Sequence, residues 1–290
     1  MHPVSAVPGA AEIATWWTWD PLVIGGLLVS SAVYTCGVAR LWRHAGPGRG
    51  VKPWQAAAHG AGIAVIAVAL LSPLDHASDV LFSAHMAQHE LLMLVAAPLI
   101  VLGRPLVPAV WALPHDWRVR ARRIGRSAPV AGAWRVLTLP AVALLVHAAT
   151  RWAWHIPSAF DAALADERIH AVQHLTFFVT AALFWWTLVH GRYGRAGYGV
   201  GVVFVFFTLI HSGLLAAMLS FADHPLYAHG ARSAAWGVDG LVDQERAGLV
   251  MWVPASIIMM GIALALLAAW LGGAERRARL LEGSCAVPPS

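Results

Sequence analysis

The sequence predicts an all-α integral membrane protein, a bundle of about seven transmembrane helices. Of its 290 residues 59% are hydrophobic and only 12% are charged, whereas soluble domains are roughly 45–50% apolar and about 25% charged. The mean hydropathy is +0.63. Disorder is excluded by the same figures, because disordered chains combine low hydrophobicity with high charge. Two cysteines, Cys36 and Cys285, form no CxxC motif, so neither a disulfide framework nor a thiolate metal site is expected.

Seven apolar stretches reach the length of about 20 residues that a helix needs to cross the hydrocarbon core. They are residues 21–42, 54–72, 79–102, 134–154, 168–190, 198–221 and 247–271. We therefore expect a transmembrane domain at 21–272, preceded by an extracytoplasmic segment (1–20) and followed by a cytoplasmic tail (273–290). The first 20 residues have no basic region and no small-residue cleavage site, so no signal peptide is predicted.

The basic residues predict the orientation of the bundle. Sixteen of the 20 Lys and Arg residues fall on one side of the predicted spans. The other side holds Arg151, Arg168, Arg232 and Arg246. Because cytoplasmic loops carry the excess of Lys and Arg, the N-terminus is expected outside and the C-terminus in the cytoplasm. Attraction of these residues to anionic lipids of the cytoplasmic leaflet accounts for the basic charge without nucleic acid as a partner. The stretch Pro114–Ser127 is typical of a short interfacial helix.

Two copies of the pattern H-x-x-Q-H suggest a functional site. One is His85–His89 in the third stretch, and the other is His170–His174 in the fifth. Residues four apart share one helix face, and both stretches enter the membrane from the predicted outer side. Histidine inside a membrane is by default a functional residue, and imidazoles from two helices can converge on one metal ion. We expect His85, His89, His170 and His174 to be ligands, with Gln88 and Gln173 orienting the imidazoles.

Further side chains in the outer half are candidates for additional ligands. They are His76, Met86, His155, His211 and Met251. Imidazole suits zinc, copper, iron and nickel, and thioether sulfur favours Cu(I), so the mixture favours copper. A haem held by one histidine from each helix, such as His89 and His174, is the competing interpretation. A third interpretation is that the histidines form a structural hydrogen-bonding network. Structural hydrogen bonding is the role expected for His59, His147 and His190.

Hydrolytic chemistry is not indicated, and the chain is not expected to be an enzyme. Neither motif has the glutamate of H-E-x-x-H, and there is no paired carboxylate or nucleophile beside a base. Glu90 is the one acid deep in a predicted span. We expect it to pair with an arginine or a histidine, with proton transfer as the alternative role.

Four segments resemble a known family. They are HMAQHELLMLVAAPLIVLGRP (His85–Pro105), WHIPSAFDAALADERIHAVQH (Trp154–His174), LFWWTLV (Leu183–Val189) and DQERAGLVMWVP (Asp243–Pro254). Together they resemble the CtaG family, bacterial multi-spanning membrane proteins associated with assembly of caa-type cytochrome c oxidase. The resemblance covers about residues 54–271 and is most specific in the two H-x-x-Q-H segments. Ala97 departs from it, since a second proline is expected there.

The resemblance implies a protein of the bacterial cytoplasmic membrane that helps to mature a haem–copper oxidase, with oxidase subunits as partners and copper handled on the outer face. The positions that match the family are His85, Gln88, His89, Trp154, His155, Asp161, His170, Gln173, His174, Asp243, Gln244 and Trp252. Asp243 and Gln244 are thereby implied to close the site from above. A b-type membrane cytochrome that carries electrons is the alternative function. A transporter of a metal or small ligand ranks third, because only the two motifs hint at an internal repeat.

Overall fold

The computed structural model describes residues 16–191, 198–228 and 230–285, and within them every regular element is helical. The α-helices are α1 (Pro21–Ala45), α2 (Pro53–Leu71), α3 (Pro73–Val80), α4 (Phe82–Glu90), α5 (Ala97–Leu102), α6 (Leu106–Ala112), α7 (His115–Gly125), α8 (Ala128–Leu137), α9 (Pro140–Trp154), α10 (Pro157–Ala165), α11 (Glu167–His190), α12 (Tyr198–Ser220), α13 (Gly230–Ser233) and α14 (Gly240–Cys285). A π-helical segment, η2 (Leu91–Ala96), joins α4 to α5, and a 3₁₀ turn, η4 (Ala234–Trp236), follows α13. The predicted all-α class is confirmed.

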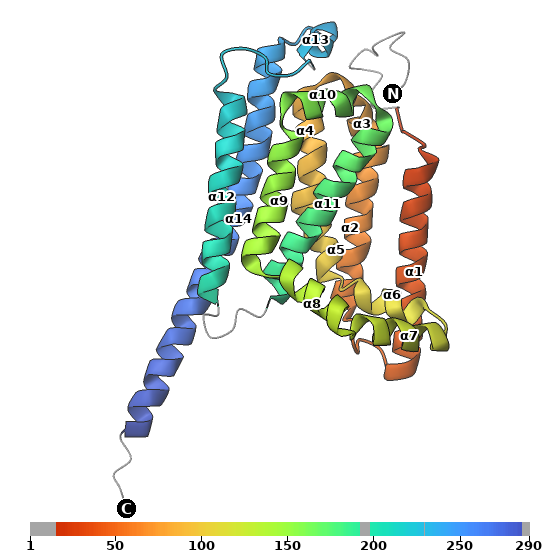
Figure 1. The fold of residues 1–290 in the computed structure, drawn as a ribbon, viewed down its shortest axis with the longest axis vertical. Coiled ribbons are helices and arrows are strands. Elements are labelled where there is room, and N and C mark those ends of the chain that lie inside the picture. Colours follow the sequence, from red (N-terminus) through yellow and green to blue (C-terminus); the bar gives the residue numbers. More distant parts are fainter. Residues whose placement is uncertain (1–15, 192–197, 229, 286–290) are drawn as a thin grey trace, which may run out of the picture.

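The long helices lie side by side as a bundle, with short helices at both ends (Figure 1). Helices α3, α10 and α13 lie at one end, and α6 and α7 lie at the other. Six helical units are long and apolar enough to cross a membrane: α1, α2, the unit Phe82–Leu102, α11, α12 and the part Gly240–Ala274 of α14. Their outward faces carry exposed apolar side chains such as Leu28, Phe206 and Ile257, as expected of a protein surrounded by lipid. The chain is a membrane protein.

A seventh span exists if the pair α8 and α9 counts as one, but this pair is bent by 68°. The predicted stretch 134–154 therefore contains a break. Its cause is Pro140, which lacks a backbone N–H and disfavours the helical conformation of the residue before it. Leu139 is accordingly extended, with φ −66° and ψ 133°. Helix α9 keeps 15 residues, or about 22 Å of length.

The helix that begins with α4 widens into a π-helix directly after Glu90. Proline at position 98, near the start of α5, cannot donate the hydrogen bond of a regular helix. The N–H of Ala97 instead reaches back to the carbonyl of Leu92, and the indole Nε1 of Trp185 donates to the carbonyl of Met93 at 2.8 Å. Single π-helical turns often accompany functional sites, and this one adjoins the H-x-x-Q-H pattern of α4.

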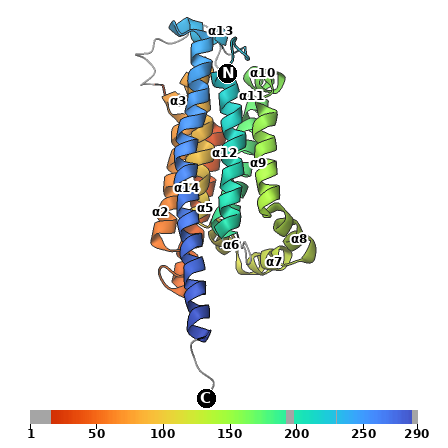
Figure 2. The same ribbon diagram turned by 90° about the vertical axis from the view of Figure 1, so that its left-hand side faces the viewer.

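Helices α12 and α14 pack along their length (Figure 2). Gly248 of α14 permits the contact, because a Cβ at this position would lie 2.8 Å from the carbonyl oxygen of Ala216. Small residues allow such close approach in membrane helix pairs. Helix α14 then continues to Cys285 with no break at the predicted start of the tail.

The predicted interfacial stretch forms α7, which begins directly after Pro114. The guanidinium of Arg118 lies 4.2 Å from the ring centroid of Trp111. Its place at the membrane surface, and which end of the bundle faces outward, remain predictions from the basic residues. The predictions for residues 1–15, Arg192 and Arg195 fall outside the described residues.

Candidate metal centre

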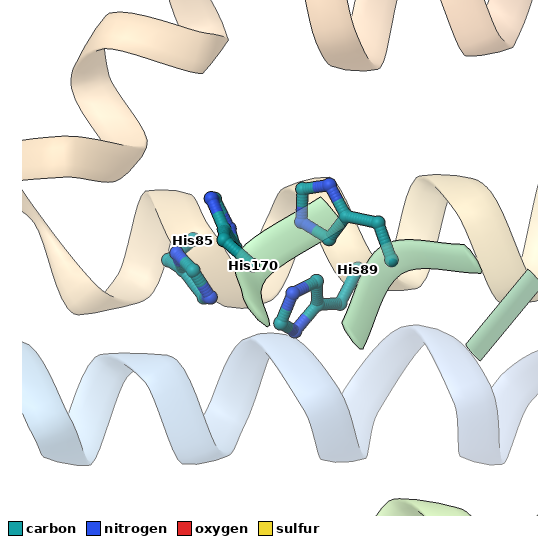
Figure 3. Close-up of side chains that lie close together, drawn as sticks. His85, His89 and His170 are labelled. Atoms are coloured by element: carbon teal, nitrogen blue, oxygen red, sulfur yellow. The ribbon is translucent and has the colours of Figure 1, made fainter. Parts of the chain in front are cut away.

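The two H-x-x-Q-H patterns bring four imidazoles together, as Figure 3 shows for His85, His89 and His170. One ring nitrogen from each of His85, His89, His170 and His174 can be chosen so that all four lie within 4.8 Å of one another. The ring centroids are 4.3 Å apart within each pair, and 5.2 Å (His85–His170) and 5.0 Å (His89–His174) across the helices. A tetrahedral ion with bonds of about 2.0–2.1 Å needs ligand atoms about 3.4 Å apart. Small side-chain rotations would close this gap.

The imidazoles are withdrawn from solvent, and several of their nitrogens lack protein partners. His85 and His89 are each 1% exposed, while His170 and His174 are half-buried. Among the described residues, no hydrogen-bond partner is found for either ring nitrogen of His89 or for Nε2 of His170 and His174. Buried polar atoms in proteins are almost always paired. These nitrogens are therefore suited to hold a ligand.

Aromatic rings form apolar walls around the four histidines. Phe160 of α10 lies 5.2 Å from His85, and Phe177 of α11 lies 4.8 Å from His89, between ring centroids. Met86 and Met251 are buried in the apolar cluster that contains Phe160. Their predicted role as ligands therefore stays a prediction, while their packing role is clear.

Asp243 of α14 fixes the start of the helix that carries His85 and His89. Its carboxylate accepts hydrogen bonds from the backbone N–H of Phe82 at 2.6 Å and of Ser83 at 3.2 Å, and from the Ser83 hydroxyl at 2.6 Å. A negative group at a helix N-terminus satisfies free N–H groups and complements the helix dipole. The adjacent Gln244 binds the backbone of Leu226 and Leu219. Both residues thus hold backbone beside the site.

The two glutamines of the patterns differ. Nε2 of Gln88 donates to the carbonyl of Ala69 and to Oδ1 of Asp75, both at 2.8 Å. Its amide hydrogens thereby tie α4 to α2 and α3. The expected role of Gln88 was to orient the imidazoles, and these two hydrogen bonds do not go to an imidazole. Burial raises the pKa of the Asp75 carboxyl above its ordinary value, and the hydrogen bond from Gln88 opposes that shift. Gln173 is 1% exposed, and no partner is found for its amide among the described residues.

Glu90 follows His89 directly and pairs with an arginine, as predicted. Its Oε1 lies 3.0 Å from Nη2 of Arg151, and both side chains are buried. Arg151, which was counted with the basic residues of the outer side, lies in the last turn of α9. A buried carboxylate is costly without a compensating charge. The position of Glu90 in a predicted span therefore predicts a basic residue in a neighbouring helix.

The remaining predicted residues lie outside the group of four. His155 is buried, with Nδ1 2.7 Å from the carbonyl of Arg151, and His76 packs edge-on against Trp16. His211 lies in the middle of α12. Two of the three histidines expected to form structural hydrogen bonds do so, His147 with Thr180 and His190 with the carbonyl of Val101. His59 instead stacks on Tyr34, and no hydrogen-bond partner is found for either of its ring nitrogens among the described residues. Two further histidines belong to the loop after the sixth predicted span: His224 is exposed, and His229 falls outside the described residues.

The fold and site define a helical membrane protein with a candidate metal-binding centre of four histidines. The family model of the cytochrome c oxidase caa3 assembly factor (Caa3_CtaG) matches residues 32–272, and the chain belongs to this family. This confirms the resemblance drawn from the four sequence segments.

Curated relatives are similar over most of the chain. One protein of Mycobacterium bovis and one of Mycobacterium tuberculosis, both described only as uncharacterized, are each 24% identical over 277 residues. The match covers 91% of this chain and 40% of each relative's length, so the chain spans less than half of these proteins. No solved structure matches the chain significantly.

Proposed function

We propose that this chain binds copper at the four-histidine site and passes it to a cytochrome c oxidase during assembly. Membership of the caa3 assembly-factor family supports the assembly role. The observation that carries the copper proposal is the convergence of four ring nitrogens within 4.8 Å, contributed by two separate helices. In this proposal copper is cargo, and oxidase subunits are the partners that receive it.

The chemistry of the donor set favours a soft ion of low charge. Imidazole is a good ligand for copper, and the group of four contains no carboxylate or thiolate. Four neutral donors leave the charge of the ion uncompensated, and an uncompensated buried charge becomes more costly as it grows. Cu(I) therefore suits the site better than a divalent ion. The half-buried pair on α11 provides a side from which the ion can leave.

The geometry argues against the haem alternative. A haem held by both helices needs an open slot between their imidazoles, with one ligand on each face of the ring. The neighbouring cavity is lined by His170 and His174, and neither histidine of α4 lines it. The imidazoles of α4 and α11 instead contact each other closely.

The location of the site follows from the predicted orientation. Both histidine pairs lie in the half of the bundle near α3 and α10 (Figure 1), which is the outer half if the basic residues face the cytoplasm. In a bacterial cytoplasmic membrane the site then opens to the extracytoplasmic side. We propose that copper is handled there and that the protein is not itself an enzyme.

Copper analysis of the purified full chain in lipid nanodiscs tests this function. After loading with copper and removal of excess, the wild type should retain about one ion per chain, and His89→Ala and His174→Ala should lose most of it. His224→Ala removes an exposed histidine near the same end of the bundle, and His190→Ala removes one at the far end of α11; both should retain the wild-type content. Full copper content and full oxidase maturation in the first two variants would refute the shared site.

A further inference from the structure

A cavity of about 350 Å³ lies directly beside the four histidines. His170, Ala171 and His174 of α11 form one wall, and residues of α1, α2 and α3 form the opposite wall. The buried Nε2 atoms of His170 and His174 have no partner among the described residues. The cavity therefore adjoins two of the four candidate ligands from one side.

Four carboxylates line this cavity, and no lysine or arginine of the described chain does so. They are Asp20, Asp75, Asp79 and Glu167. Asp20 precedes α1, two come from α3, and Glu167 opens α11. Asp79 and Glu167 are close enough to His170 to interact with it electrostatically. Deeper in the bundle the lining becomes apolar, with Val23, Ile66, Leu70 and Phe178.

The other sides of the site are closed. His85 and His89 are almost fully buried, Phe160 and Phe177 pack against them, and Asp243 ties the start of α4 to α14. An ion that arrives through the cavity meets the imidazoles of α11 before those of α4.

We propose that this acid-lined cavity is the route by which a metal cation reaches the four histidines. The inference rests on the proposed function, because it assigns a path to the same site. A cleft lined by charges of one sign and bounded by apolar walls concentrates counter-ions and raises their association rate by about 10- to 1,000-fold. The carboxylates attract the cation, and the unpaired imidazole nitrogens bind it.

Two of the four acids also have structural roles. Asp20 caps α1 by accepting from the backbone N–H of Leu22 and Val23, and Asp75 accepts hydrogen bonds from Gln88 and Thr18. Asp79 is half-buried and Glu167 is exposed. Neutralising Asp79 and Glu167 therefore leaves the cap of α1 and the hydrogen bonds of Asp75 in place.

The experiment measures the rate of metal uptake by the full chain in nanodiscs of zwitterionic lipid. Cu(I), kept reduced in an anaerobic buffer without strong chelators, is the probe, and the change in tryptophan fluorescence reports its binding. The test variant is Asp79→Asn with Glu167→Gln. The control is Asp223→Asn with Glu245→Gln, which removes two charges near the same end of the bundle from residues that do not line the cavity.

The test variant should bind Cu(I) at least about threefold more slowly at low ionic strength, and added salt should reduce this difference because salt screens the charges. Its final copper content should equal that of the wild type and of the control, since the four ligands remain. An association rate equal to that of the control, in a wild type that does load copper, would overturn the route and leave the four-histidine site standing. A wild type that takes up no copper would overturn both.

Discussion

The same five-residue pattern has two different environments in this protein. On α4, His85 and His89 are buried, Gln88 is fully hydrogen-bonded through its amide hydrogens, and Glu90 is paired with Arg151. On α11, His170 and His174 line a cavity, and Gln173 has no partner among the described residues. The residue that follows the second pattern is Leu175, which is 61% exposed.

This difference indicates a division of roles between the two copies. The α4 copy is held in place by contacts with Ala69, Asp75 and Arg151 of other helices. Its imidazoles therefore form the fixed part of the site. The α11 copy faces the cavity, so its imidazoles form the accessible part. Identical sequence spacing thus predicts which side chains share a helix face, and the surrounding helices determine what each pair does.

The largest effect is expected from the ion pair that only the α4 copy has. Arg151→Met leaves the Glu90 carboxylate buried without its partner, and breaking such a buried pair costs about 3–5 kcal/mol. The thermal unfolding midpoint in detergent should fall clearly. Leu175→Ala, at the equivalent position after the α11 copy, should change it little because the side chain is exposed. Similar midpoints for the two variants would contradict the claim that the α4 copy is more firmly fixed than the α11 copy.

A smaller difference is expected between the histidines themselves. Loss of a residue that only orients a metal ligand lowers metal affinity about 10- to 100-fold. Loss of a ligand from the fixed α4 copy should therefore lower metal affinity by more than this. We expect at least about a 100-fold loss of copper affinity for His89→Ala and about tenfold for His170→Ala. Competition titration with a chelator measures both. Equal losses would show that the two copies contribute alike.

The two glutamines should respond in opposite ways in the metal-free protein. Gln88→Leu leaves the carbonyl of Ala69 and the carboxyl of Asp75 without this donor, which costs about 1–3 kcal/mol. Gln173→Leu removes a buried amide without partners and replaces it with an apolar side chain of similar size, so stability should stay the same or rise. Scanning fluorimetry compares them, and destabilisation by Gln173→Leu would contradict the assignment.

The smallest effect concerns the cap of α4. Asp243→Ala removes the acceptor for the backbone of Phe82 and Ser83, and the loss of a helix cap costs about 0.5–2 kcal/mol. Copper affinity should fall modestly as well, because the start of α4 loses its anchor. Asp166→Ala removes the matching cap of α11, because the Asp166 carboxylate accepts hydrogen bonds from the backbone N–H of Arg168 and Ile169. A larger effect on copper binding from Asp166→Ala would reverse the proposed roles of the two copies.

Most of the bundle could be predicted from hydropathy, because every spanning helix must be long and apolar. An interruption at Pro140 could be predicted as well, because proline cannot continue a regular helix, but the bend of 68° could not. The fourfold spacing of His85 and His89 predicted a shared face. The repeated pattern also predicted convergence with the histidines of α11. The position of α4, however, depends on distant contacts, such as the hydrogen bond from Phe82 to Asp243 of α14, 161 residues away. No local pattern encodes such contacts, and the cavity acids were missed for the same reason.

The central claim is that one copper ion is shared by histidines of α4 and α11. X-ray absorption spectroscopy of the copper-loaded full chain tests it most directly. The claim predicts three to four imidazole nitrogens at about 2.0 Å in the wild type, with fewer imidazoles in both His89→Ala and His174→Ala. A spectrum that either substitution leaves unchanged would contradict it.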